Sequence, residues 1–234
     1  MGCESPRPNR PFLAATRRYD CGGWLAMSPR APSPLEKALF TLKQHGLLLA
    51  ADSTLPSVAT LVAGEPISGS WWGHRLSGDI YQLMKEMDNH PDVAQVRLVS
   101  RKVTYLYRSL WPTLLAVASS REPWQTDGLS SMAKQLLDAV LESGELRTDH
   151  VPRVGGPKPG DAARDLERRL LVYGEQVHTD TWAHAKLLQS WERWADRVGA
   201  SAGALASEEG KLMLERGVAE LNARFGGKGT LPWM

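Results

Sequence analysis

The chain has 234 residues, of which 42% are hydrophobic and 23% are charged, and its formal net charge is +2. This length suits one large domain or two small ones, and the composition excludes collagen-like, coiled-coil and globally disordered proteins. No apolar run approaches the roughly 20 residues that a membrane-spanning helix needs, so we expect no membrane association.

The positive charge belongs to the amino-terminal end of the chain. Residues 1–26 contain four arginines and two acidic residues, which leaves 24 basic and 24 acidic residues in the remainder. Any argument for nucleic-acid binding must therefore come from local clusters and not from the total charge.

Residues 1–34 are rich in Pro, Arg, Gly and Ser without a helix or strand period, so we expect a disordered leader. The stretch lacks the apolar segment of a secretory signal. Both cysteines, Cys3 and Cys21, lie in it, so a disulfide framework is excluded and a cytoplasmic location is expected. Met27 is a second plausible start of the protein.

Residues 35–121 are expected to form a helical subdomain that contains one β-hairpin. Ser33-Pro34-Leu35-Glu36 has the spacing of a capping box, so a helix begins there and ends at Gly46. Further helices are predicted over residues 56–63 and 76–88, and another begins at Pro112. Between them, residues 93–110 alternate in hydrophobicity, which predicts a hairpin that turns at Ser100-Arg101-Lys102.

Residues 122–128 are a connector rich in turn-forming residues and are the best internal boundary. After it, the sequence predicts helices over 132–141 and 161–170, strands over 170–179 and 183–189, and helices over 190–198 and 207–225. Helix, connector, helix and two-stranded ribbon is the order of a winged helix. We therefore predict a mainly α (α+β) fold with a winged-helix domain over 127–198 and a C-terminal helix and tail over 199–234. No internal repeat of fixed period is found.

Two basic clusters are candidate DNA-binding surfaces. The stretch between Asp92 and Glu122 has no acidic residue but contains Arg97, Arg101, Lys102 and Arg108. The second cluster is Arg153, Lys158, Arg164, Arg168 and Arg169 on and before the second winged-helix helix. These side chains can pair with phosphates. The alternatives are a hairpin whose Tyr105 and Tyr107 rings pack in the core, and a solvated or partner-binding helix face.

The segment around Trp71, Trp72 and His74 is a candidate pocket for a base or another flat ligand. The alternative is that these rings, like the other tryptophans, fill the core with the indole N–H bonded to a carbonyl. Glu175, His178 and His184 have side chains that can bind metals, but Glu175 and His178, three residues apart on one strand, would not converge without a bulge. No metal site is therefore predicted, and no cofactor is predicted either. Catalytic residues are left unassigned, since no established catalytic motif is present.

Four segments carry a resemblance to a known family: Gly69-Ser-Trp-Trp-Gly-His74, Arg108-Ser-Leu-Trp-Pro112, Arg121-Glu-Pro-Trp124 and residues 166–179. They resemble small bacterial proteins related to the AlkZ-type DNA glycosylases, whose larger members are built from winged-helix units. The resemblance implies DNA binding and, in the enzymes, excision of alkylated bases. A Q-x-Q or Q-x-D motif is associated with catalysis in that family, and this chain has no Q-x-Q.

We therefore hypothesise a winged-helix protein that binds DNA, either duplex or damaged, in repair or regulation. Two alternatives stay open. One is an active glycosylase, and the other is a winged-helix module whose partner is a protein, which suits a neutral body.

Overall fold

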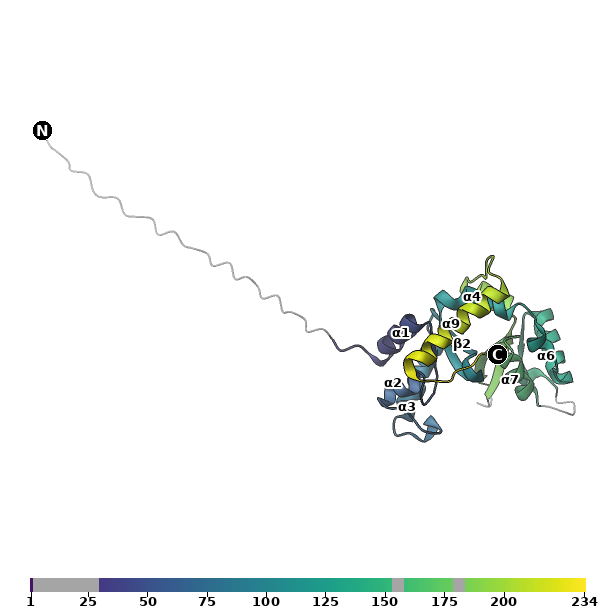
Figure 1. Cartoon of the computed structure of the whole chain (residues 1–234), viewed down its shortest axis with the longest axis horizontal. Helices are drawn as coiled ribbons and strands as arrows, with labels where there is room; N and C mark the ends of the chain where they lie inside the picture. The colour runs from purple at the N-terminus through teal and green to yellow at the C-terminus, as the bar shows by residue number, and fades with distance from the viewer. Residues whose placement is uncertain (2–29, 153–157, 179–183) are drawn as a thin grey trace. The chain divides into compact units, whose positions relative to one another are not determined.

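The computed structural model describes Met1 and residues 30–152, 158–178 and 184–234. Most of the leader, Arg153 of the second basic cluster, and Trp182 lie outside the described residues. Residues 32–234 form one compact unit that contains two small antiparallel sheets, and 53% of the described residues are helical (Figure 1). The expectation of a mainly α (α+β) fold is confirmed at this level.

The first sheet lies within residues 34–107. It contains the predicted hairpin and one further strand that the sequence did not predict. The elements are α1 (Pro34–His45), β1 (Leu47–Leu49), α2 (Val58–Ala63), α3 (Ser77–Asp88), β2 (Val93–Arg97) and β3 (Val103–Tyr107). β3 is the central strand and pairs antiparallel with β2 and with the unpredicted β1.

The second sheet is built by residues 131–189. Its elements are α6 (Ser131–Ser143), β4 (Glu145–Arg147), the 3-10 turn Thr148–His150, α7 (Pro159–Arg168), β5 (Tyr173–His178) and β6 (His184–Gln189). The two expected helices and the expected two-stranded ribbon are confirmed. β4 was not predicted, and it pairs with β6.

The two sheet-forming segments share one order of elements. Each begins with a helix that ends at a left-handed glycine, Gly46 with φ 72° and Gly144 with φ 80°. A three-residue strand, helical structure and a hairpin follow, and both sheets have the strand order first, third, second. A structural repeat is therefore present, although the sequence shows no repeat of fixed period.

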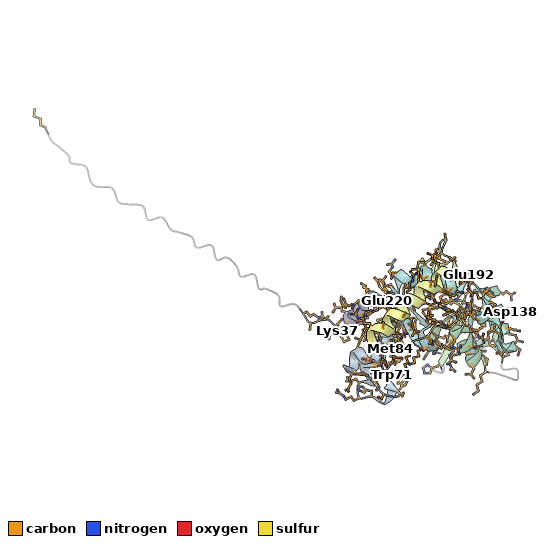
Figure 2. The ribbon with its side chains drawn as sticks, viewed as in Figure 1. Lys37, Trp71, Met84, Asp138, Glu192 and Glu220 are labelled. Carbon is orange, nitrogen blue, oxygen red and sulfur yellow. The ribbon has the colours of Figure 1, made fainter. Side chains whose placement is uncertain are left out.

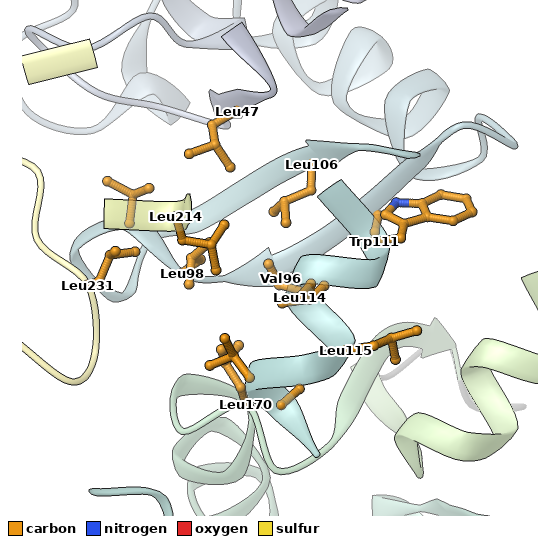
Figure 3. Packing of buried hydrophobic residues seen from close by; sticks show 14 of the residues in the cluster. Leu47, Val96, Leu98, Leu106, Trp111, Leu114, Leu115, Leu170, Leu214 and Leu231 are labelled. Atoms are coloured by element: carbon orange, nitrogen blue, oxygen red, sulfur yellow. The ribbon is translucent and has the colours of Figure 1, made fainter. Parts of the chain in front are cut away.

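The remaining helices join the two segments. They are α4 (Trp111–Ala118), the short α5 (Pro123–Thr126), α8 (Trp191–Val198) and α9 (Ser207–Phe225). α4 and α9 pack along each other (Figure 1). Figure 3 shows side chains of the first sheet, such as Leu106, meeting Leu114 of α4, Leu214 of α9 and Leu170 in one buried cluster.

Core packing accounts for several of the aromatic residues. Tyr105 is 1% exposed and packs against α1–α3, as alternation predicts. Trp191 is buried and its indole N–H donates to the carbonyl of Leu170 at 2.7 Å, which is the core role expected of such a ring. Trp111 is also buried, but its indole nitrogen has no hydrogen-bond partner among the described residues.

The connector at residues 122–128 is tied firmly to the second segment. Gln125 is completely buried, and its amide nitrogen donates to the carbonyls of Ala118 and Arg169, each at 3.2 Å. In return, the guanidinium of Arg169 donates to the carbonyls of Trp124, Gln125 and Asp127. The boundary between the two segments is therefore a hydrogen-bonded junction between α4, α5 and α7.

Candidate functional site

Three cavities border one another on the side of the body where α3, α7 and the β2–β3 turn meet. Their volumes are about 550, 530 and 120 Å³, and Arg97 of β2 lines all three. We call them together the basic groove, because six basic side chains line them: Arg97, Arg101, Lys102, Arg164, Arg168 and Lys186. Among the described residues, Glu167 is the only acidic residue that lines them.

Two of the six cations are paired at the rim of the groove. Lys102 lies 2.7 Å from Asp52, and Arg164 lies 3.1 Å from Asp161. Arg101 and Arg168 are exposed and form no ion pair within the described part of the chain. With Glu167, Asp52 and Asp161 counted against the six cations, the described residues give the groove a local charge of +3, while residues 27–234 together are neutral.

Glu167 holds the floor of the groove together. Its side chain is only 7% exposed and lies between Arg97 Nε, at 3.2 Å, and Lys186 Nζ, at 2.5 Å. This carboxylate therefore joins α7 to one strand of each sheet. Gly174 of β5 makes room for it, because a Cβ at that position would lie 2.0 Å from Glu167 Oε1.

The basic turn between β2 and β3 has an unusual backbone. Ser100 and Arg101 have φ values of 50° and 58°, which is the left-handed region that side chains other than glycine seldom adopt. The amides of Arg101 and Lys102 donate to the carbonyls of Leu98 and Val99, and the Val99 amide donates to Thr104 Oγ1 at 3.1 Å. The turn is thus fixed with Arg101 and Lys102 at the groove.

Two tryptophans of the candidate pocket lie in the same groove. Trp71 and Trp72, in the 3-10 turn Trp71–Gly73, stack with ring centroids 4.0 Å apart. Trp71 lines the cavity that contains Arg101 and Arg168, and Trp72 lines the cavity that contains Arg164 and Lys186. Figure 2 labels Trp71 at the α3 side of the body. His74 is not a lining residue, and its Nδ1 accepts a hydrogen bond from the Leu76 amide.

Three other predicted DNA-binding residues, Arg108, Lys158 and Arg169, do not line the groove. Arg108 is at the opposite end of β3 and pairs with Asp92 at 3.1 Å, and Lys158 precedes α7 as an exposed residue. Arg153 falls outside the described residues. Arg169 pairs with Asp165 and donates hydrogen bonds to carbonyls of the connector, so its guanidinium is occupied by contacts within the protein.

Several polar and aromatic lining residues, including Glu167, were not among the predicted site residues. Tyr81 of α3 and both Gln176 and Lys186 of the second hairpin face the groove. Alternation along β6 puts Lys186 on the same face as His184, and that signal could have found it. His184 is placed beside Gln176, with Nδ1 2.7 Å from the amide nitrogen. Glu175 pairs with Arg197.

The spacing Q-x-D does occur in this chain, at Gln125-Thr126-Asp127, and the sequence reasoning overlooked it. The structure gives Gln125 four hydrogen bonds within the junction: its Oε1 accepts from the Glu122 amide at 2.9 Å and from Ser120 Oγ at 3.0 Å, besides the two bonds that its nitrogen donates. Neither Gln125 nor Asp127 lines the groove. The Gln125 side chain and the Asp127 carbonyl therefore belong to the junction between the two segments.

Among the described residues, no group of three His, Cys, Asp or Glu side chains could hold a metal ion. None of the described helices is both long and apolar enough to cross a membrane. Comparison of the chain with protein-family models, curated proteins and solved structures finds no match.

Proposed function

We propose that the protein binds DNA, with the phosphate backbone held in the basic groove. The observation that carries this proposal is the convergence of six basic side chains from three parts of the chain around Arg97. Lysine and arginine neutralise phosphates and release their counterions, which supplies most of the sequence-independent affinity for DNA. Arg101 and Arg168, which have no acidic partner among the residues that the structure describes, are the cations best able to do so.

We further propose that both sheet-forming segments are winged helices. In each, a helix precedes a two-stranded ribbon, so α3 and α7 have the place of the recognition helix, and the β2–β3 and β5–β6 hairpins have the place of the wing. Two successive winged-helix units would also agree with the resemblance to AlkZ-related proteins, whose larger members are built from such units. The inner face of α7 is buried against β2, which leaves Arg164 and Arg168 of that helix for contact with DNA.

The test is a salt titration of DNA binding, followed by fluorescence anisotropy, from about 50 to 200 mM salt. The variant Arg101→Glu/Arg168→Glu should weaken binding at least about tenfold and reduce the slope of log affinity against log salt by about 2. Since both side chains are exposed, the variant should fold normally.

The matched control is Lys134→Glu/Arg216→Glu, which changes the net charge equally on exposed positions of α6 and α9 outside the groove. This control should retain the affinity and the slope of the unaltered protein. Equal loss of affinity in both variants would mean that only total charge matters, and it would contradict the groove as the binding site.

Base excision is a second candidate function, which the buried carboxylate of Glu167 beside the smallest cavity favours. A carboxylate next to a breaking glycosidic bond can stabilise the positive charge that develops on the sugar. Release of free base from alkylated DNA should then occur, and Glu167→Gln should abolish it while DNA binding persists. Failure to release any base would exclude this function.

A further inference from the structure

Trp71, Trp72 and Tyr81 line one side of the basic groove, and binding of the DNA backbone alone does not account for them. Trp72 is 63% exposed although it lies beside Trp71 and Tyr81, with centroid distances of 4.0 and 5.9 Å. A large indole normally gains from burial, so a ring left this open beside a cavity is available to a ligand.

The position of the Trp72 ring is also fixed by contacts on its inner side. Trp71 packs against the buried cluster of α1, α2 and α3, and Trp72 stacks on Trp71 with an interplanar angle of 25°. The 3-10 turn that carries both rings closes with a hydrogen bond from the His74 amide to the Trp71 carbonyl at 3.0 Å. The exposed ring therefore extends a rigid stack that starts in the core.

The residues around the Trp72 ring indicate which ligand could bind beside it. The cavity that Trp72 and Tyr81 line also contains Arg97, Arg164 and Lys186, and none of its described lining residues is acidic. Glu167 pairs with Arg97 and Lys186, and Asp161 pairs with Arg164, so these three cations keep an excess of one positive charge. An apolar peptide would match the rings but not the cations, and a phosphate alone would match the cations but not the rings. A nucleotide strand supplies both, with anionic phosphates and flat bases in regular succession.

We propose that Trp72 is a stacking platform for an unpaired base of single-stranded DNA, whose phosphates lie on Arg97, Arg164 and Lys186. In a duplex both faces of each interior base are covered by its neighbours, so only an unpaired base can stack on the indole. This inference rests on the proposed function and adds the form of DNA that the groove accepts.

The experiment compares three ligands that have the same number of phosphates per strand: an oligothymidylate, a strand made only of abasic tetrahydrofuran residues, and a blunt duplex. Trp72→Ala should weaken binding of the oligothymidylate about 5- to 150-fold, as expected for one lost base stack. It should leave binding of the abasic strand unchanged. Trp72→Phe should recover most of the affinity, because it restores a flat ring.

The control is Phe40→Ala, which removes an equally exposed ring of α1 that is not part of the groove and should change nothing. Equal weakening of oligothymidylate and abasic strand by Trp72→Ala would overturn the stacking role, as would no weakening at all. A Trp72 dependence seen with the duplex and not with the single strand would overturn the choice of ligand. Failure of the proposed function is distinct, since Arg101→Glu/Arg168→Glu would then leave binding of all three ligands unchanged.

Discussion

Ser100 and Thr230, which are 130 residues apart, hold each other through two hydrogen bonds. The Ser100 amide donates to the Thr230 carbonyl at 2.7 Å, and the Thr230 amide donates to Ser100 Oγ at 3.3 Å. Ser100 begins the left-handed pair that places Arg101 at the groove. The carboxyl-terminal tail after α9 thus stabilises the basic turn, with Leu231 buried beside it in the central cluster.

The contact between Ser100 and Thr230 predicts that Ser100→Gly is more stable than Ser100→Ala. Ser100→Ala loses the Oγ acceptor and keeps the strained φ, so it should be destabilised by about 1 kcal/mol. Ser100→Gly loses the same bond but relieves a left-handed conformation that costs a non-glycine residue about 1 kcal/mol, so it should remain close to the unaltered protein. Urea unfolding measures both, and a glycine variant less stable than the alanine variant would contradict this account.

Gln125 is predicted to be a structural residue although it belongs to the Q-x-D spacing. Gln125→Leu leaves the Glu122 amide and the carbonyls of Ala118 and Arg169 without their buried partner, so it should lower the free energy of unfolding by about 3 kcal/mol. Gln135→Leu, on an exposed position of α6, is the matched control and should stay within about 0.5 kcal/mol. A Gln125 variant with normal stability and a lost activity would instead indicate a catalytic role.

Much of the fold follows from local signals in the sequence. The capping box at Ser33 and the glycine after Leu42-Lys43-Gln44-His45 define α1, and Ile80, Leu83, Met84 and Met87 are the buried face of α3 that helical spacing predicts. The strands β1 and β4 were missed because three residues are too few to show alternation. All three leucines of β1 are in fact buried, since helices cover both faces of the first sheet.

The groove was only partly predictable, because its members meet through tertiary structure. The acid-free stretch drew attention to Arg97, Arg101 and Lys102, all of which line the groove. The sequence could not show that Asp52, fifty residues earlier, pairs with Lys102. Nor could it show that Trp72 and Arg164 share a cavity, since no local pattern links α7 to the turn before α3.

Gly174 should be sensitive to the smallest enlargement. In Gly174→Ala the new Cβ would overlap Glu167 Oε1, and the buried carboxylate cannot shift without losing Arg97 or Lys186. We expect a loss of about 1 to 3 kcal/mol in the free energy of unfolding, as for other overpacked sites. Gly78→Ala in α3, where a Cβ meets nothing within 4 Å, should be neutral or stabilising by up to about 1 kcal/mol. Thermal unfolding of the two variants makes the comparison.

Glu122 gives the junction an acid-sensitive contact with α9. Its carboxylate accepts hydrogen bonds from Lys211 Nζ and from Ser207 Oγ, each at 2.7 Å. The hydrogen bond from Lys211, followed by that from Ser207, lowers the pKa of Glu122 below its ordinary value. A lowered folded-state pKa means that this stabilisation is complete above the ordinary value of about 4.3 and is lost as the pH falls through the folded-state pKa.

Glu122→Gln should therefore be less stable than the unaltered protein at pH 7, by about 1 kcal/mol, because the side chain is only partly buried. The difference should shrink toward zero near pH 3, since protonation then removes the charge from the unaltered protein as well. Lys211 remains charged throughout, because the same contact raises its pKa. Urea midpoints at pH 7, 5 and 3 test this, and a difference that is constant with pH would show that the charge of Glu122 contributes nothing to the junction.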